Sequence, residues 1–125
     1  MKSILITGST GFIGLNILKN LINKHKVFVI LRNNSVNKKK IDTFKKVKII
    51  RYKHFDQLNK ELQKIKVDVV LHCATHYTKQ HTYKDITKLA ESNIIFGNII
   101  LENLKQMKTK KFINFSTVWE DYNSQ

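Results

Sequence analysis

The feature that most constrains the fold of this chain is a glycine-rich heptapeptide, GSTGFIG, at residues 8–14. It follows a short apolar run at residues 2–7 and precedes apolar residues at helical spacing. Three of the four glycines of the chain stand at its first, fourth and seventh positions. A strand, a glycine turn and a helix in this order are typical of the first crossover of an α/β sheet.

The glycine spacing fits a turn that binds phosphate groups. The first glycine permits the tight turn, the second lets the backbone approach a pyrophosphate, and the third allows close packing of helix on strand. Free amides at the start of the helix favour an anion, and the helix dipole adds to them. No Gly-Lys-Ser/Thr follows, which excludes a Walker loop. A plain strand–helix turn is the alternative, but the concentration of glycines here favours a dinucleotide-binding turn.

The rest of the chain repeats the alternation of strand and helix. Further strands are expected in four apolar runs, at residues 26–31, 47–51, 67–71 and 111–115. Helices are expected in three segments, at residues 12–22, 56–64 and 86–104. Unbroken apolar runs are typical of parallel strands that are covered on both faces. Right-handed crossovers then predict a three-layer α/β fold, a doubly wound, Rossmann-like parallel sheet of about five strands in the order 3-2-1-4-5.

Composition supports one domain over residues 1–125, since no linker, repeat or low-complexity segment is evident. We expect the lysine-rich segment at residues 32–40 to be a mobile loop. The single thiol, Cys73, excludes a disulfide framework. The apolar runs are too short to cross a bilayer, and the first strand begins too early for a cleaved signal. We therefore expect a cytoplasmic protein with no membrane partner.

The formal net charge of +14 raises the alternative of a basic nucleic-acid-binding module. Lysine supplies 21 of the 23 positive residues, however, and only Arg32 and Arg51 carry the planar fork on which base and phosphate readers rely. Lysine, asparagine and isoleucine make up 49 of the 125 residues, a skew that an AT-rich genome imposes on any fold. Most of the charge is therefore interpreted as a solvated surface, and no nucleic-acid partner is expected.

The end of the second expected strand bears on the choice of dinucleotide. About twenty residues past the glycine turn, an acidic residue holds the adenosine ribose of NAD in such folds. Here that place is taken by Arg32 and Asn33. An arginine would meet a ribose 2′-phosphate and stack on the adenine face. The sequence therefore predicts NADP in preference to NAD, with a solvated surface arginine as the alternative.

Four ordered motifs resemble one family. They are TGSTGFIG at residues 7–14, HCAT at residues 72–75, Asn93 in the long helix, and FINFST at residues 112–117. Together they resemble the extended short-chain dehydrogenase/reductases, the NAD-dependent epimerase/dehydratase group that acts on nucleotide sugars. Shorter segments look most similar to the CDP-abequose/paratose synthases, which reduce a 4-keto sugar nucleotide with NADPH; these are residues 29–32, 71–77 and 112–114.

The resemblance implies hydride transfer at a sugar carbon and a role for each matching residue. The pyrophosphate would be cradled by the turn, through Gly8, Thr10, Gly11, Phe12 and Ile13. Arg32 would face the adenosine, and the approach to ribose and nicotinamide would be lined by Cys73, Ala74 and Thr75. Thr117 would be the catalytic residue that hydrogen-bonds the substrate oxygen.

Structural readings of the same residues stay open. Cys73 can be a small buried apolar residue, His72 a satisfied strand-end histidine, and Asn93 a helix residue bonded to nearby backbone. Thr117 can simply end a strand. No metal site is expected, because the histidines near Cys73 lack carboxylates around them.

Two departures from the family pattern matter. The acidic residue that touches adenine after the third strand is replaced by lysine or histidine in residues 52–56, although Asp56 stands close by. The catalytic Tyr-x-x-x-Lys pair is absent, because only three residues follow Tyr122. We therefore expect a chain that is truncated before that pair and before the sugar-binding region, and that is inactive alone. An inactive nucleotide-binding fragment is the alternative, and an exposed edge at residues 111–115 would favour self-association.

Overall fold

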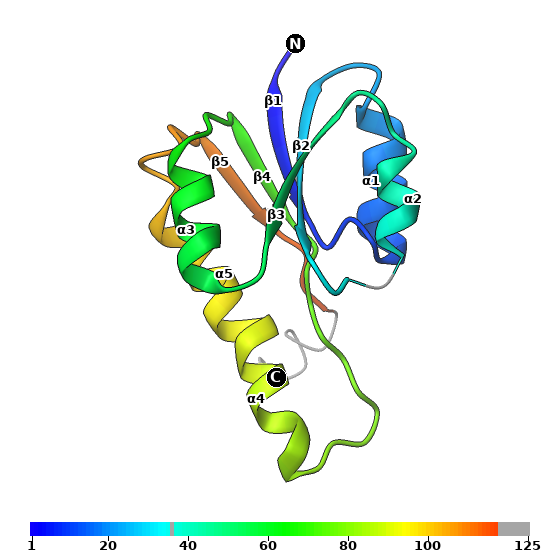
Figure 1. The fold of residues 1–125 in the computed structure, drawn as a ribbon. Helices are drawn as coiled ribbons and strands as arrows, with labels where there is room; N and C mark the ends of the chain where they lie inside the picture. Colours follow the sequence, from blue (N-terminus) through cyan, green and yellow to red (C-terminus); the bar gives the residue numbers. More distant parts are fainter. Residues whose placement is uncertain (36, 118–125) are drawn as a thin grey trace, which may run out of the picture.

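The computed structural model describes residues 1–35 and 37–117 (Figure 1). Strands and helices alternate along the chain in the order β1 (Ser3–Thr7), α1 (Phe12–Leu21), β2 (Lys26–Arg32), α2 (Lys38–Asp42), β3 (Val47–Tyr52), α3 (Phe55–Gln63), β4 (Val69–His72), α4 (Ile86–Ala90), α5 (Phe96–Glu102) and β5 (Lys111–Asn114). A 3₁₀ turn, η1 (Tyr83–Asp85), precedes α4, and a π-helical turn, η2 (Glu91–Ile95), joins α4 to α5.

The five strands form one parallel sheet in the order β3-β2-β1-β4-β5, which confirms the predicted α/β topology. Helices α1 and α2 cover one face, and α3 and α5 cover the other (Figure 1). β1 pairs with β2 on one side and with β4 on the other, so the direction of the crossovers reverses at its carboxyl end. Such a switch point is where open α/β sheets bind their ligands.

The sheet separates two hydrophobic cores because neighbouring residues of a strand point to opposite faces. Leu5 belongs to the core beneath α3 and α5, whereas Ile4 and Ile6 belong to the core beneath α1 and α2. All three side chains are buried, at 5% exposure or less. Burial on both faces explains why β1 reads as a continuous apolar run rather than an alternating one.

The predicted loop at residues 32–40 is wrong in its second half, where helix α2 begins at Lys38. The lysine run hides one anchoring residue, because Ile41 is fully buried in the core beneath α1 and α2. That burial stabilises a short helix whose other residues are polar. β4 begins two residues later than predicted, at Val69, although Val67 is buried and donates its amide to the carbonyl of Met107 at 3.0 Å.

The predicted long helix ends at Glu102 and is interrupted by the π turn η2. β5 occupies an edge of the sheet and leaves Ile113 39% exposed. Self-association through this edge stays a prediction. Within the described residues, no helix combines the length and apolar character needed to span a membrane.

Candidate functional site

The glycine turn packs against the residues that follow β4 so closely that side chains are excluded from it. Gly8 has a φ of 68°, and a Cβ on it would lie 2.7 Å from the backbone nitrogen of Ala74. A Cβ on Gly14 would lie 2.3 Å from the carbonyl oxygen of Gly8. These distances are shorter than any real carbon contact, so the turn keeps this shape only with glycine at both positions.

The first turn of α1 presents backbone donors that the helix itself leaves unused. Gly11 is the N-cap, with extended backbone, no side-chain cap bond and no acidic residue in the turn that follows. The first amides of a helix have no intrahelical acceptor, and the helix dipole makes this end positive. The turn can therefore bind an anion through its backbone.

The end of β4 is tied to β1 by a buried hydrogen-bond chain. The amide of Ala74 donates to Thr7 Oγ1 at 3.1 Å, and the Thr7 hydroxyl lies 2.9 Å from Nδ1 of His72. The His72 ring packs against Phe96 and Phe112, with centroids 5.9 and 5.7 Å away. Burial lowers the pKa of His72, which favours the neutral ring. His72 is thus a satisfied strand-end histidine, as its structural reading predicts.

Asn93 fixes the loop that leaves β4. Its Oδ1 accepts a bond from the His76 amide at 2.7 Å, and its Nδ2 donates to the His76 carbonyl at 2.9 Å. Asn93, which belongs to the π turn, thus bonds both the N–H and the C=O of His76. This confirms that Asn93 bonds to nearby backbone.

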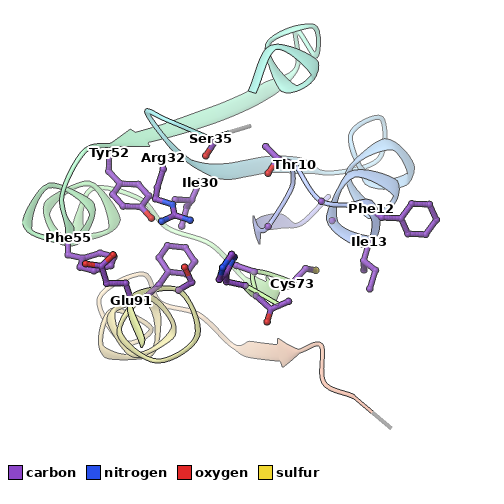
Figure 2. Close-up of a pocket in the computed structure, with 18 residues that line it drawn as sticks. Thr10, Phe12, Ile13, Ile30, Arg32, Ser35, Tyr52, Phe55, Cys73 and Glu91 are labelled. Atoms are coloured by element: carbon purple, nitrogen blue, oxygen red, sulfur yellow. The ribbon is translucent and has the colours of Figure 1, made fainter. Parts of the chain in front are cut away.

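A cavity of about 370 Å³ opens at the carboxyl ends of the strands (Figure 2). All nine residues predicted to bind the cofactor line it; they are Gly8, Thr10, Gly11, Phe12, Ile13, Arg32, Cys73, Ala74 and Thr75. The topology therefore brings together the glycine turn, the end of β2 and the start of the β4–η1 loop.

The lining residues contribute in different ways. Figure 2 shows the side chains of Phe12 and Ile13 pointing away from the cavity, and they are 85% and 52% exposed. These two residues therefore offer their backbone amides. Cys73 is half-buried, and burial raises the pKa of its thiol, so it is a neutral wall residue and not a thiolate.

Sequence reasoning missed half of the residues that line the cavity, including its aromatic wall. These additional lining residues are Gly14, Ile30, Ser35, Tyr52, Phe55, His76, Glu91, Ser92 and Phe96. The one signal that points to some of them is position, because Tyr52 ends β3 on the same sheet edge as Arg32. Burial raises the pKa of Tyr52 to about 12, with Arg32 opposing the rise and Glu91 adding to it.

The remaining predictions fall outside this cavity. Thr117 is exposed just beyond β5 and is not among the lining residues, so its catalytic role stays a prediction. Tyr122 lies outside the described residues. In the described part of the chain, no three His, Cys, Asp or Glu side chains gather closely enough to hold a metal ion.

Comparison with known proteins places the chain in a family. The profile of the NAD dependent epimerase/dehydratase family matches residues 4–122. Since this match spans most of the sequence, the chain belongs to that family.

Two characterised relatives are larger than this chain. A dTDP-D-glucose 4,6-dehydratase from Dictyostelium discoideum is 31% identical over 94% of this chain and 29% of its own length. A CDP-abequose synthase from Salmonella muenchen is 26% identical over 97% of this chain and 39% of its own length. The chain therefore spans less than half of each relative.

Solved structures agree with this fold. A UDP-glucuronic acid 4-epimerase mutant from Bacillus cereus, in complex with a fluorinated substrate analogue and NAD, is 28% identical over 92% of this chain and 40% of its own, with a TM-score of 0.73. An epimerase from Methanothermobacter thermautotrophicus has a TM-score of 0.79 at 23% identity, over 94% of this chain and 35% of its own, and supports the fold alone.

Proposed function

We propose that this chain is the coenzyme-binding part of an enzyme that transfers a hydride at a carbon of a nucleotide sugar, and that its coenzyme is NADP in preference to NAD. The observation that carries the proposal is the cavity, which joins the amides of the glycine turn to an aromatic pocket at the end of β3. Family membership and the substrates named for the relatives support the same reading.

The residues present fit such a dinucleotide. A pyrophosphate needs backbone donors, which the first turn of α1 supplies. The missing Cβ atoms of Gly8 and Gly14 let the backbone of the turn pack closely on Ala74 and on itself, which gives the turn the shape that presents those donors. A base needs flat apolar walls, which Tyr52 and Phe55 supply. The stretch from Cys73 onward, held by Asn93, lies where the nicotinamide half would extend.

When bound, the nicotinamide supplies or accepts the hydride, while this chain binds and orients. Thr117 is proposed to hydrogen-bond the oxygen at the reacting carbon, which its place after β5 supports. The sugar-nucleotide substrate is proposed from the relatives, whose names carry dTDP, CDP and UDP sugars. Reductase, epimerase and dehydratase chemistry all remain compatible with these residues.

The preference for NADP rests on Arg32. It ends β2 and lines the cavity, and none of the lining residues that the structure describes on β2 is acidic. A guanidinium there can pair with a ribose 2′-phosphate in a fork-like arrangement. A carboxylate at this place would instead select the free ribose hydroxyls of NAD.

Binding of reduced coenzymes to the chain tests this proposal directly. We expect NADPH to bind at least about tenfold more tightly than NADH, as measured by nicotinamide fluorescence, because charge-assisted hydrogen bonds contribute about 1.5–3 kcal/mol. Arg32→Glu should abolish the preference. Arg51→Glu is the matched control, since Arg51 pairs with Asp42 on the surface and does not line the cavity.

The two parts of the proposal fail separately. Equal affinity for NADPH and NADH would contradict the NADP preference and leave coenzyme binding intact. If neither coenzyme bound to the folded chain, the coenzyme-binding function itself would be wrong.

A further inference from the structure

The base end of the cavity is walled by aromatic rings. The Tyr52 ring is stacked with Phe55 at a centroid distance of 6.2 Å and with Phe96 at 6.1 Å. Tyr52 and Phe96 are only 12° from parallel. Flat apolar walls of this kind suit a heteroaromatic ring, which gains stacking energy on them whatever its identity. The walls therefore explain base binding but not a choice between bases.

The side chain of Ser92 supplies a polar atom with no hydrogen-bond partner among the described residues. Ser92 lines the cavity and is 9% exposed, yet its buried Oγ makes no hydrogen bond to any described residue. A buried hydroxyl in this state destabilises the free protein, and such a group calls for a functional explanation. Less than 1 Å² of this oxygen is accessible, so a ligand in the cavity would supply the missing partner once the Ser92 side chain rotates toward it.

Glu91 is the one carboxylate among the described residues that line the cavity. In the view of Figure 2 it is drawn below Tyr52 and Arg32, at the same end of the cavity. Its contribution to the raised pKa of Tyr52 places its charge near that ring. An ionised carboxylate only accepts hydrogen bonds, so a half-buried one at the edge of this aromatic wall can accept N–H donors from a ligand.

The end of β3 offers no competing carboxylate. Lys53 and His54 are exposed, and His54 Nδ1 accepts the amide of Gln57 as the cap of α3. Asp56 is exposed and does not line the cavity. Among the described residues, a carboxylate that recognises a ligand at this end of the cavity can therefore come only from Glu91, on the opposite wall.

The π turn η2 gives that helix the required register. Ser92, Phe96 and Ile100 are all buried at intervals of four residues, an interval that drifts around an ideal α-helix by about 40° per step. The π turn spans the first of these two intervals, from Ser92 to Phe96, where its wider winding offsets the drift; π turns of this kind are frequent at functional sites. It keeps Phe96 and Ile100 in the core, Ser92 and Glu91 on the cavity, and Asn93 on the loop.

From these observations we propose that Glu91 and Ser92 select the adenine base of the coenzyme, an inference that rests on the proposed function. The Glu91 carboxylate would accept an N–H of the exocyclic amino group, and the Ser92 hydroxyl, rotated toward the cavity, would bond a ring nitrogen. Adenine presents both partners along one edge. A purine with a carbonyl oxygen in place of the amino group sets two acceptors against each other at Glu91, so the site rejects it.

Two coenzymes that differ in this group, and in the proton that hypoxanthine carries on N1, test the proposal. The chain is titrated with NADPH and with reduced nicotinamide hypoxanthine dinucleotide phosphate, which carries a carbonyl in place of the adenine amino group. We expect NADPH to bind about tenfold or more tightly, the range of one charged hydrogen bond. Glu91→Gln should reduce the ratio to about twofold or less, because an amide can either accept or donate.

Glu102→Gln is the matched control, since Glu102 is an exposed carboxylate further along the same helix and does not line the cavity. It should leave the ratio unchanged. Ser92→Ala should weaken the binding of both coenzymes several-fold without lowering the melting temperature of the free chain, because its hydroxyl bonds none of residues 1–35 and 37–117. A purely structural role for Ser92 would lower the melting temperature and leave affinity unchanged.

Equal affinity for the two coenzymes, or a ratio that survives in Glu91→Gln, would overturn the base selectivity while coenzyme binding stands. If the folded chain bound neither coenzyme, the proposed function would fall and the base selectivity with it.

Discussion

The two ends of the cavity are built in different ways. At the glycine turn the functional groups belong to the backbone, and the side chains of Phe12 and Ile13 point outward. At the base end the functional groups belong to side chains that come from β2, β3, α3 and the π turn, such as Arg32, Tyr52 and Glu91. The glycine turn thus depends on the missing side chains of a short stretch of sequence. The other end depends on side chains from segments that are distant in the sequence.

This difference determines how each end responds to substitution. A turn built from backbone groups is destabilised when an added side-chain atom clashes with neighbouring backbone. Side chains that point away from the turn have little effect on it. A side-chain-built pocket tolerates backbone shifts but loses a specific contact with each truncated group. Side-chain additions at the turn should therefore cost stability, whereas side-chain changes at the other end should cost selectivity.

The largest expected effect is that of Gly14→Ala. Its Cβ would lie 2.3 Å from the oxygen and 2.7 Å from the carbon of Gly8, both backbone atoms that have no rotamer to change. We expect the free energy of unfolding in urea to fall by about 3 kcal/mol or more, the range of severe steric substitutions.

Gly97→Ala is the matched control for this experiment. Gly97 lies in helix α5, and the Cβ of an alanine there would lie 3.4 Å from Nε2 of His72, its nearest neighbour, an ordinary van der Waals distance. There alanine should stabilise the chain by up to about 1 kcal/mol. If both variants unfolded at the same urea concentration as the parent chain, close backbone packing would not be what requires glycine at the turn.

The second-largest effect is expected for Asn93→Ala, which acts on the loop that follows β4. Asn93→Ala removes both bonds to the His76 backbone and leaves a peptide group without its partners. We expect the free energy of unfolding to fall by about 1–2 kcal/mol, the sum of two exposed hydrogen bonds. Coenzyme affinity should also fall, because the loop that begins at Cys73 loses its anchor.

Asn98→Ala is the control for Asn93. Asn98 is exposed on the same helix, and its Nδ2 bonds only the carbonyl of Ile94 one turn earlier. This variant should change the free energy of unfolding by no more than about 0.5 kcal/mol and should leave the coenzyme affinity unchanged. An Asn93→Ala chain that bound coenzyme as tightly as the parent would show that the loop keeps its place without the clamp.

The same contrast explains how much of this molecule could be predicted from its sequence. The glycine turn is local, so its motif identified all the lining residues of that end except Gly14 as cofactor contacts. The sheet order followed from five buried apolar runs and the handedness of crossovers. Helix α2 was missed because a single buried residue, Ile41, outweighs the lysines around it.

The base end could not be predicted in the same way. Tyr52, Glu91 and Ser92 come to line one cavity only when β3 and the helix after β4 face each other across it, and no spacing within either segment predicts that arrangement. The π turn at Glu91–Ile95 sets which way Glu91 and Ser92 face. Its position depends on how the helix packs against the sheet, which the spacing of apolar residues does not reveal. Arg32 was found because the end of β2 has a known geometric relation to the glycine turn.

The smallest and sharpest test separates backbone from side chain at one residue. Phe12 is the first residue of α1, and its ring is 85% exposed and points away from the cavity. Phe12→Ala removes the ring and keeps the amide, so we expect coenzyme affinity to stay within about twofold and stability within about 0.5 kcal/mol. A large loss of affinity in this variant would show that the ring itself contacts the ligand.

Phe12→Pro removes the amide donor at a position where proline is well tolerated. The first helical residue has no intrahelical acceptor for its N–H, and the extended backbone of Gly11 before it, with φ −84° and ψ 171°, suits a residue that precedes proline. The chain should therefore keep its circular dichroism spectrum and melting temperature while its affinity for NADPH falls several-fold. Unchanged affinity in a folded Phe12→Pro chain would mean that this amide does not bind the pyrophosphate, and the glycine end would then have to bind through other amides of the turn.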